Sequence, residues 1–583
     1  MRYVDRDTNT PLVAVSNRPS LENKTGGWRF ARPVFVDRVA PCSRQCPAGE
    51  DIAGMLFLAS QGRYEDAWRL IVRENPFPAV MGRVCYHTCE QRCNRAEHDE
   101  AVSIHSVERF LGDYALERGL QVEDLPEEGE PSVAVVGAGP SGLSAAYHLR
   151  RMGYRLTVLD AMERPGGLMQ YGIPAYRLPR DVLDGEIARL ERMGVRFEMG
   201  RKVGGEKVWA DLATEHDAVF LAIGAHREAR LDLEGESLDG VFRALPFLAD
   251  VNHGSFPALG EHVAVIGGGN SAIDCARVCR RLGAKVSVFY RRSEAEMPAH
   301  PEEVALAREE GVAFEFLRTP EAILGPDRVR GVRLARMELG EPDETGRRRP
   351  VPTGKTLDAA CTGLILAVGE SPDPESLPGG LELDTSGVPS DAFGRTGLAK
   401  VFVGGDLAPI PRTVTHAIGS GKRAAAAIQA FLSGKGPEHV DILFRWGDTG
   451  NVCLGDLEDR TLFPRRNPIP EVVEYDGLNP FYFDRRPALS IRNRSVEERL
   501  GGFDEVVSGP TEAEALAEAA RCFNCGSCTE CGNCYLFCPD VSVLKDPGGF
   551  GYAIDLDYCK GCGICVHECP RGAMTMSFGE GMP

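Results

Sequence analysis

The 19 cysteines of this 583-residue chain are distributed very unevenly. Ten of them lie between Cys522 and Cys569, and five lie between Cys42 and Cys93. Disulfide-rich secreted proteins are small and spread their cysteines along the chain, whereas spacings of two or three residues are typical of metal ligands. We therefore expect both groups of cysteines to bind metal.

The C-terminal group contains one run twice, C-x2-C-x2-C-x3-C-P. This run is typical of bacterial ferredoxins with two [4Fe–4S] clusters, in which the fourth cysteine of each run binds the other cluster. One predicted cluster takes Cys528, Cys531, Cys534 and Cys569, and the other takes Cys559, Cys562, Cys565 and Cys538. Zinc knuckles or disulfides are the alternatives, but the repeated Cys-Pro ending is not a zinc pattern.

The N-terminal group has wider gaps. It consists of Cys42-x3-Cys46-Pro and Cys85-x3-Cys89-x3-Cys93, with helical segments between. These spacings also suit [4Fe–4S] binding. Zinc is the alternative, although Cys₄ zinc sites prefer paired C-x₂₋₄-C knuckles.

A first glycine-rich turn could bind a dinucleotide. A β-branched run leads into Gly137-x-Gly139-x-x-Gly142, and a second predicted strand ends on Asp160. The glycines allow a tight turn and a close backbone approach to a pyrophosphate, and the acid can accept a ribose hydroxyl. The alternative, a purely structural turn, does not explain the acid at this distance.

A second turn repeats the fingerprint as Gly267-x-Gly269-Asn270-Ser271-Ala272. Its second predicted strand, Lys285–Tyr290, is followed by Arg291 and Arg292 rather than by an acid. Because a guanidinium matches a 2′-phosphate, we favour NADP(H) as the cofactor, and NAD(H) stays an alternative. The alternative is that the two arginines are solvated loop residues.

The elements that position these residues can be read from the periodicity. Residues 42–119 have helical spacing, and the acidic segment 121–131 is predicted to be a linker. Segments 132–149 and 261–282 share one plan of strand, turn and helix, which implies two doubly wound domains. Residues 1–40 are polar and expected to be irregular. Residues 440–510 show little periodicity and are expected to form an extended connection on the surface.

The composition excludes several classes. The net charge of −19 argues against nucleic-acid binding and favours solubility. No run of about 18 uncharged apolar residues occurs, so we expect no membrane span. The first residues lack the apolar core of a secretory signal, and we expect a cytoplasmic protein.

Five stretches carry a family resemblance: residues 75–85, 166–179, 290–298, 403–406 and 412–421. In these the chain resembles the small (beta) subunit of NADPH-dependent glutamate synthase and its relatives. The relatives include the large subunit of NADH-dependent ferredoxin:NADP oxidoreductases and the flavin domain of dihydropyrimidine dehydrogenase. The resemblance runs from about Cys42 to Phe431.

The resemblance implies FAD at the first turn and NAD(P)H at the second, with the second domain inserted into the first. Asp406 would hold the flavin ribityl chain, and a helix starting near Val414 would point its positive end at the flavin. The chain would cross between the domains at 222–224 and 367–369. The expected FAD residues are Gly137, Gly139, Pro140, Ser141, Gly142, Asp160, Gly167, Leu168, Arg177, Gly224, Gly405, Asp406, Thr413, Val414 and Ala417. The expected NADP residues are Gly267, Gly269, Asn270, Ser271, Ala272, Arg291, Arg292 and Gly369.

For the N-terminal cysteines the resemblance implies two clusters. One would use Cys46, Cys85 and Cys89 with Glu108 as fourth ligand, unless Glu108 is an ordinary solvated acid. The family's other cluster needs a C-x2-C pair upstream of Cys42, where this chain has only residues 34–37, Val-Phe-Val-Asp. The missing form occurs instead at residues 516–525, so we expect Cys522 and Cys525 to complete that cluster with Cys42 and Cys93.

We therefore expect a multidomain chain with a helical N-terminal iron–sulfur domain, two Rossmann-like α/β domains and a C-terminal α+β ferredoxin-like domain. The expected ranges are 1–128 for the helical domain, 129–245 and 360–436 for the FAD domain, 246–359 for the NAD(P) domain, 437–515 for a linker and 516–583 for the ferredoxin-like domain. Cys275 and Cys279, one helical turn apart, are expected to be buried apolar residues.

These expectations predict electron transfer between NAD(P)H and ferredoxin or iron–sulfur partner subunits, with no catalytic acid, base or nucleophile. The chain would be one subunit of a complex such as a 2-oxoacid:acceptor oxidoreductase. A glutamate synthase small subunit is an alternative, although such subunits usually lack a ferredoxin domain. A non-catalytic electron relay is another, and the intact glycines of both turns argue against it.

Overall fold

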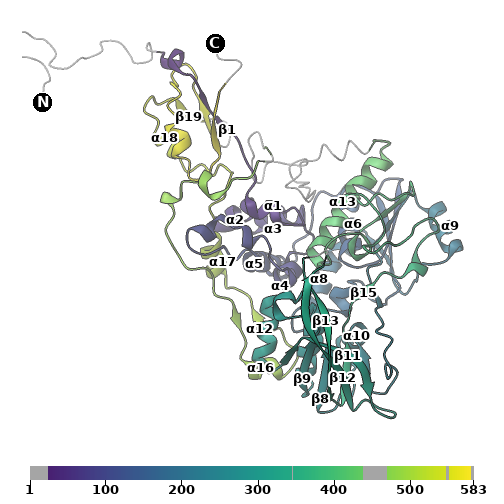
Figure 1. The fold of residues 1–583 in the computed structure, drawn as a ribbon. Helices are drawn as coiled ribbons and strands as arrows, with labels where there is room; N and C mark the ends of the chain where they lie inside the picture. The colour runs from purple at the N-terminus through teal and green to yellow at the C-terminus, as the bar shows by residue number, and fades with distance from the viewer. Residues whose placement is uncertain (1–23, 344–345, 437–468, 470, 547–550, 579–583) are drawn as a thin grey trace, which may run out of the picture.

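The computed structural model describes residues 24–343, 346–436, 469, 471–546 and 551–578. A small C-terminal domain, a helical domain and two domains on parallel sheets make up the molecule (Figure 1). None of the helices in the described ranges combines the length and apolar character that a membrane span requires.

The helical domain confirms the predicted helical N-terminal region. Its helices are α1 (Pro41–Gln45), α2 (Ile52–Ser60), α3 (Tyr64–Val72), α4 (Pro78–Val84) and α5 (Ile104–Glu117). The Asp51 carboxylate caps α2 by accepting a hydrogen bond of 3.0 Å from the Gly54 amide. Trp68 and Phe77 are completely buried between these helices and anchor the core.

The first parallel sheet has the strand order β16-β5-β2-β3-β4. Its strands are β2 (Ser132–Val136), β3 (Arg155–Leu159), β4 (Arg196–Glu198), β5 (Ala218–Leu221) and β16 (Val401–Val403). The helices of this domain are α6 (Pro140–Arg151), α7 (Leu168–Tyr171), α8 (Arg180–Arg192), α9 (Glu206–Glu215) and α13 (Val414–Leu432). The central strand β2 is buried along its whole length, as is typical of a parallel sheet covered on both faces.

The second parallel sheet, of order β10-β9-β8-β14-β7, is inserted into the first domain. Its strands are β7 (Val241–Arg243), β8 (His262–Ile266), β9 (Lys285–Tyr290), β10 (Ala313–Phe316) and β14 (Gly363–Leu366). Its helices are α10 (Ala244–Asn252), α11 (Asn270–Arg281) and α12 (Pro301–Glu309), and an antiparallel sheet of β11 (Arg318–Leu324), β12 (Gly331–Pro342) and β13 (Arg348–Ala360) is attached. The sheet starts at β7 and ends at β14, so it extends beyond the expected range 246–359.

The chain crosses between the two domains where the sequence predicted small-residue turns. Directly after the turn at Gly224 lies β6 (Arg227–Glu228), and directly after Gly369 lies β15 (Glu370–Ser371). These two strands pair antiparallel and form the two-stranded connection between the domains.

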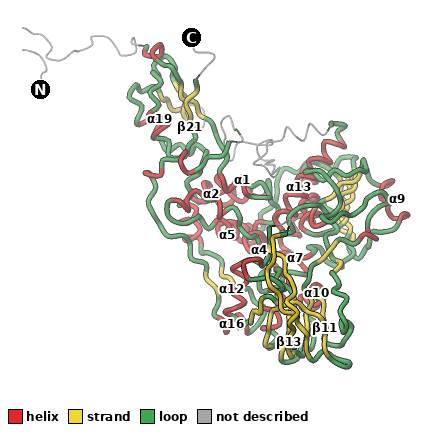
Figure 2. Tube along the Cα trace, viewed as in Figure 1, coloured by secondary structure: helices red, strands yellow, loops and turns green. Residues whose placement is uncertain are grey.

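Residues 471–520 form an extended segment that we call the strap. It contains the short strands β17 (Arg492–Asn493) and β18 (Val507–Ser508), α16 (Val496–Leu500) and α17 (Glu512–Ala519). Most of it is loop (Figure 2), and it runs from the C-terminal domain to α12 and back to the helical domain (Figure 1). Residues 437–468 and 470 of the expected linker lie outside the described residues.

The C-terminal domain is small and built around its cysteines. Its elements are α18 (Asn533–Leu536), β19 (Val543–Lys545), β20 (Tyr552–Ile554), α19 (Ile564–His567) and β21 (Met574–Ser577). The strand predicted between the two cysteine runs is confirmed as β20, which pairs with β19.

The expectation that residues 1–40 are irregular is wrong for part of that segment. Strand β1 (Arg32–Phe35) pairs antiparallel with β21, with Val34 opposite Thr575. The pattern gave no signal because β1 has only four residues and its partner lies at the other end of the chain. The first described residues thus belong to the C-terminal domain (Figure 1).

Candidate nucleotide cleft and metal centres

One cleft of about 760 Å³ receives both glycine-rich turns. Gly137 has a φ of +110°, and a side chain there would collide with the carbonyl of Ala222 on the neighbouring strand. Gly137 and Gly142 therefore shape the turn rather than line the cleft. The expected flavin residues that line it are Gly139, Pro140, Ser141, Asp160, Gly167, Leu168, Arg177, Gly224, Gly405, Asp406, Thr413, Val414 and Ala417.

Asp160 holds the first turn in place. Its carboxylate accepts hydrogen bonds from the amides of Ala138 at 2.7 Å and Met162 at 2.8 Å. Each oxygen keeps a second lone pair, so the carboxylate can still accept a ribose hydroxyl from the cleft that it lines.

The N-terminal end of α13 opens into the same cleft. Thr413 caps it by accepting a hydrogen bond of 3.2 Å from the His416 amide, and the first turn of the helix lines the cleft. Burial raises the pKa of Asp406, while Arg412 lowers it. The positive helix end fits an anionic flavin edge.

Arg177 lines the cleft, but its guanidinium is engaged elsewhere. It pairs with Asp274 on α11 at 2.9 Å and with Glu303 on α12 at 3.0 Å, and only 7% of its side chain is exposed. Expected as a flavin-binding residue, Arg177 forms an ion pair that joins the first sheet domain to the second.

The second turn occupies the other end of the cleft. The expected residues that line it are Gly267, Gly269, Asn270, Ser271, Ala272, Arg291, Arg292 and Gly369. Arg291 is exposed, and the described residues offer it no ion-pair partner. Arg292 differs, because its guanidinium pairs with Asp343 at 2.7 Å and donates to the Arg348 carbonyl at 2.8 Å.

Three arginines that line the cleft were not among the expected site residues, namely Arg318, Arg347 and Arg412. Arg318 and Arg347 line the cleft together with Arg291. They belong to the antiparallel sheet and its β12–β13 connection, so no nucleotide fingerprint contains them. The folded chain therefore adds cations to the end of the cleft where Arg291 lies.

Cys46, Cys85, Cys89 and Glu108 gather beside the cleft, and we call them the cleft-side site. Burial, and then the proximity of Glu108, raises the pKa of Cys85 to about 12. Burial also raises the pKa of Cys46 and Cys89, and each has Cys85 as a charged neighbour.

The cleft-side site directly adjoins the nucleotide cleft. Val84 and Tyr86, on either side of Cys85, line the cleft. The hydroxyl of Thr415, in the first turn of α13, donates to the Cys85 sulfur at 3.3 Å. The helix end that faces the cleft therefore also contacts a candidate cluster ligand.

Asn75 and Glu50 at this site were missed by the sequence analysis. The Asn75 side-chain amide donates to Glu108 and to Glu50, at 2.9 Å each. Burial raises the pKa of Glu50 to about 7 and also raises that of Glu108. The only signal for Asn75 was its place in one of the family stretches.

Cys42, Cys93, Cys522 and Cys525 line one small cavity, and we call them the split site. The two ends of the chain thus meet as the sequence hypothesis required. Burial raises the pKa of Cys42, and the other three thiols raise it further. The Asn94 side-chain amide donates to the Cys525 sulfur at 3.5 Å, and the Asn524 backbone amide donates to the Cys522 sulfur at 3.3 Å.

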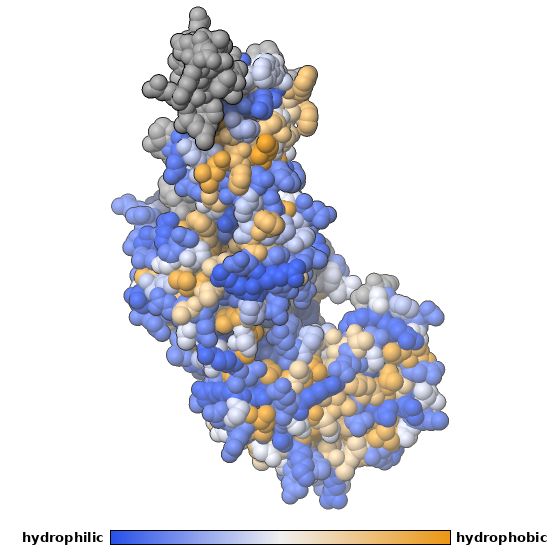
Figure 3. All heavy atoms as spheres, turned by 90° about the vertical axis from the view of Figure 1, so that its left-hand side faces the viewer, coloured by the Kyte–Doolittle hydropathy of each residue, from blue (hydrophilic) through white to orange (hydrophobic). Residues whose placement is uncertain are grey.

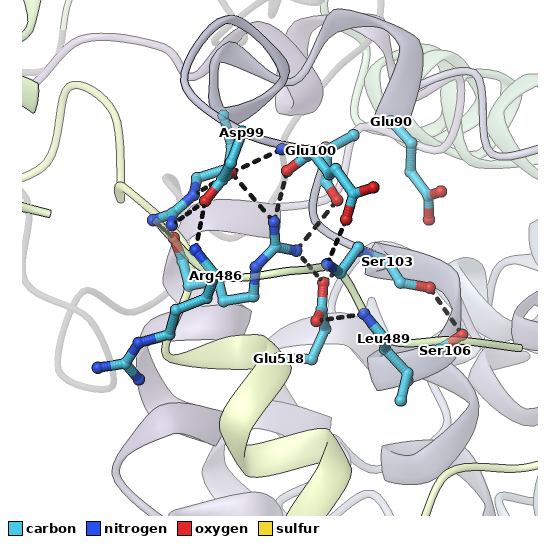
Figure 4. A network of polar contacts seen from close by, with 12 residues as sticks. Glu90, Asp99, Glu100, Ser103, Ser106, Arg486, Leu489 and Glu518 are labelled. Carbon is cyan, nitrogen blue, oxygen red and sulfur yellow. Dashed lines mark hydrogen bonds and ion pairs between the residues drawn. The ribbon is translucent and has the colours of Figure 1, made fainter. Parts of the chain in front are cut away.

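A buried polar network fixes the end of the strap, directly before Cys522 and Cys525 (Figure 4). Arg521 pairs with Glu518 at 2.7 Å and with Asp99 of the helical domain at 3.1 Å. Glu518 in turn accepts from the amides of Ser103 and Leu489, at 2.8 Å each. Burial raises the pKa of Asp99, but hydrogen bonds, led by that from Arg95, lower it more, which keeps the carboxylate charged.

The C-terminal cysteines line two further cavities in the predicted sets of four. Cys528, Cys531, Cys534 and Cys569 form the inner ferredoxin-like site, and Cys538, Cys559, Cys562 and Cys565 form the outer one. The crossed exchange of the fourth cysteine therefore appears in the folded chain.

The residues present fit iron–sulfur clusters. Three of the four groups consist entirely of thiols, which as thiolates would repel one another without a metal. The Ser527 and Thr529 hydroxyls and the Arg571 Nε are buried beside the inner site without a hydrogen-bond partner among the described residues. Sulfur atoms of a cluster would supply the acceptors that such buried donors need.

Cys275 and Cys279 are buried on α11 within the core of the second sheet domain, as expected, and Cys361 is also buried. Burial raises the pKa of all three thiols, which makes them unreactive. Cys453 lies outside the described residues.

Comparison with protein families gives three matches. The profile described as pyridine nucleotide-disulphide oxidoreductase matches residues 123–421. The profile of the 4Fe-4S cluster domain II of dihydropyrimidine dehydrogenase matches residues 36–120, and a 4Fe-4S binding domain matches residues 552–575.

Several curated proteins are similar over most of their length. The NADP(+)-dependent formate dehydrogenase subunit beta of Moorella thermoacetica is 37% identical over 553 residues, covering 88% of this chain and 75% of that protein. The NADPH-Fe(3+) oxidoreductase subunit beta of Geobacter sulfurreducens is 36% identical over 527 residues, with 84% and 76% covered. The glutamate synthase [NADPH] small chain of Escherichia coli is 37% identical over 417 residues, with 67% and 88% covered.

Proposed function

The chain belongs to the pyridine nucleotide-disulphide oxidoreductase family, in a form similar to the glutamate synthase small chain but with iron–sulfur domains on both sides, and we propose that it transfers electrons between NADPH and an iron–sulfur partner. It is an NAD(P)H-dependent flavin and iron–sulfur oxidoreductase. We further propose that it is the nicotinamide-linked subunit of a larger redox complex, such as a 2-oxoacid:acceptor oxidoreductase.

The order of the four cysteine sites is the observation that carries the proposal. The cleft-side site borders the nucleotide cleft through Cys85. Cys89 has Cys42 of the split site among its charged neighbours. Only Gly526 and Ser527 separate Cys525 of the split site from Cys528 of the inner ferredoxin-like site. Cys534 there has Cys565 of the outer site as a charged neighbour, so the sites form one row.

The protein's own groups bind, orient and exclude water. The two glycine-rich turns present backbone amides to the nucleotide phosphates, and α13 directs its positive end at the cleft. The Arg177–Asp274 pair fixes the two domains relative to each other across the cleft. Flavin bound in the cleft supplies the change from two-electron to one-electron chemistry. Four [4Fe–4S] clusters held by the four sites would extend the path away from the cleft.

The nicotinamide end supports NADP(H). Arg291, Arg318 and Arg347 together present positive charge at the end of the cleft where a 2′-phosphate would lie. Two similar proteins are also named for NADP(H). NAD(H) has no 2′-phosphate, so it would leave the exposed Arg291 without an anionic group to bind.

An exposed surface over the last cysteine sites supports a protein partner. Cys531 and Cys562 are exposed, as is Leu536 at 72% beside Cys534 on α18. Figure 3 shows hydrophobic side chains near the top of the molecule, over the C-terminal domain. The similar formate dehydrogenase and iron(III) oxidoreductase proteins are both named as beta subunits, which supports membership of a complex.

A glutamate synthase small subunit is the second candidate, favoured by the similarity to the Escherichia coli protein. That similarity covers only 67% of this chain, whereas the similarity to the formate dehydrogenase subunit beta covers 88% of it. Affinity isolation of the tagged chain from its native cells separates the two proposals. An iron–sulfur oxidoreductase subunit as the associated protein supports the first, and a glutamine-using amidotransferase supports the second.

Dye reduction by the anaerobically purified full chain tests the proposed activity. We expect NADPH to bleach the flavin and then to reduce a viologen dye, with NADH much less effective. A chain that contains flavin and iron but reduces no dye with either nucleotide would contradict the proposal.

A further inference from the structure

Arg571 lies between the split site and the inner ferredoxin-like site. It lines the inner cavity together with Cys531 and Cys569. On the other side it donates through Nη1 to the Phe523 carbonyl, and to the Asn524 side-chain oxygen at 3.0 Å. Phe523 and Asn524 are the two residues between the split-site ligands Cys522 and Cys525.

The side chain of Arg571 is held from several directions. Its guanidinium also lies over the Phe483 ring of the strap, 5.4 Å from the ring centroid. The backbone carbonyl of Arg571 accepts from the Gly526 amide at 2.6 Å, within the short connection between the two sites. Arginine is suited to such a place because its planar group stays charged and donates in several directions at once.

The Nε atom of Arg571 is the feature that contacts leave unexplained. It is buried and has no hydrogen-bond partner among the described residues. Buried donors are nearly always paired, and a sulfur atom of a cluster in the inner cavity would offer this one an acceptor. The orphaned hydroxyls of Ser527 and Thr529 belong to the same segment, and Thr529 lines the same cavity.

The thiols around Arg571 come from both sites. Burial lowers the pKa of Arg571, and Cys531, Cys522, Cys569 and Cys525 are the neighbours that raise it. Two of these belong to the split site and two to the inner ferredoxin-like site. The connection between them contains only Gly526 and Ser527, so the Cα atoms of Cys525 and Cys528 are at most ~11 Å apart.

We propose that Arg571 is a positioning residue for electron transfer, whose buried positive charge is shared by the split site and the inner ferredoxin-like site and raises the reduction potential of both. This inference rests on the proposed function, because it assumes that both sites hold clusters. One electron leaves the split site and one enters the inner site, without a proton or a change of bonds. A cation between the two sites stabilises the electron on either side, because each reduced state carries one more negative charge.

Placement between the sites gives Arg571 a second effect. A charge near only one site would change the difference between the reduction potentials of the two sites. It would thereby favour one direction of electron transfer. A charge shared by both sites moves the two potentials together, so electrons can pass either way. The direction then follows the potential of the partner protein.

Redox titrations of the Arg571→Gln and Arg571→Lys variants test the proposal. Dithionite reduces the protein stepwise, and electron paramagnetic resonance measures the reduced fraction of each site. In Arg571→Gln we expect both sites to become at least tenfold harder to reduce, equal to a shift of about 59 mV or more. In Arg571→Lys the charge is kept, so we expect most of the shift to be restored. The cleft-side site should not change in either variant.

Lys560→Gln is the matched control. Lys560 is a cation near the outer site, paired with Asp540 at 3.1 Å and having Cys562 and Cys538 as charged neighbours. Its removal should leave the split site unchanged. If Arg571→Gln loses iron, Asn524→Ala, which removes one acceptor of the guanidinium, takes its place and should lower both potentials by a smaller amount.

The titration also distinguishes a failure of the proposed function from a failure of the role of Arg571. Fewer than four cluster signals in the unaltered chain would contradict the proposed function. Four signals with unchanged potentials in Arg571→Gln, or a shift at one site only, would overturn the role of Arg571 alone.

Discussion

At the scale of single residues, neighbours in sequence have different roles. Arg291 and Arg292 were both expected to bind a 2′-phosphate, yet Arg292 is held by Asp343 while Arg291 faces the cleft without an ion-pair partner among the described residues. The strand directly before them, β9, could be predicted from its pattern. The engagement of Arg292 could not, because Asp343 comes from a separate sheet.

Arg291→Ala tests this division. We expect the KM for NADPH to rise about 10- to 100-fold, because a charge-assisted contact to phosphate contributes about 1.5–3 kcal/mol. Steady-state kinetics with NADH should change little. Arg292→Ala, as control, should lower the stability of the antiparallel sheet more than it lowers NADPH selectivity. An equal loss with both nucleotides in Arg291→Ala would rule out a 2′-phosphate contact.

Glu108 and Glu50 pose a similar choice at the cleft-side site. The sequence offered Glu108 alone, whereas Asn75 donates to both carboxylates. Among the acids, Glu108 raises the pKa of Cys85 most, and Glu50 raises the pKa of Cys46 most. A second acid of this kind cannot be recognised from spacing, because Asn75 joins two distant segments.

Comparing Glu108→Ala with Glu50→Gln identifies the ligand. We expect Glu108→Ala to lose the cleft-side cluster, and with it about four iron atoms per chain. Glu50→Gln should keep that iron and its paramagnetic signal. Iron analysis together with the spectrum of the reduced protein decides, and the reverse result would assign the ligand to Glu50.

At the scale of elements, patterns local to the chain were predicted and long-range pairings were not. Both glycine-rich turns and the repeated cysteine run have a fixed spacing. The helices and strands around them could therefore be predicted from the sequence. β1 and the strap have no periodicity of their own. β1 exists because β21 supplies its hydrogen bonds, and the strap is ordered by buried charges such as Arg521. The split site was predictable because its missing half keeps a recognisable form elsewhere in the chain.

The strap should be held mainly by its buried network. In Arg521→Ala the buried Glu518 carboxylate loses the cation that it pairs with. We expect the free energy of unfolding to fall by about 3–5 kcal/mol. The readouts are faster proteolytic cleavage within the strap and a lower denaturant midpoint.

Arg494→Ala is the matched control on the same strap. Arg494 pairs with Asp504 at 3.3 Å, and 41% of its side chain is exposed. Such a surface pair contributes about 0–1 kcal/mol. Equal effects of the two substitutions would show that the buried network does not hold the strap.

At the scale of the whole molecule, the N-terminal and C-terminal parts of the described chain meet at several places. β1 pairs with β21, and Cys42 and Cys93 share a cavity with Cys522 and Cys525. The strap also reaches the second sheet domain, where Arg499 pairs with Glu309 at 2.7 Å. These contacts attach the C-terminal domain to the helical domain and the sheet domains. They therefore keep the two ferredoxin-like sites close to the split site and the cleft-side site.

We expect electrons from the cleft to reach the C-terminal domain through the split site. The most direct test mixes NADPH anaerobically with the Cys522→Ser/Cys525→Ser variant and follows flavin absorbance and the cluster signals in time. We predict that NADPH still reduces the flavin while the two ferredoxin-like clusters stay oxidised, although dithionite reduces them. Reduction of those clusters by NADPH at the rate of the unaltered chain would contradict the account.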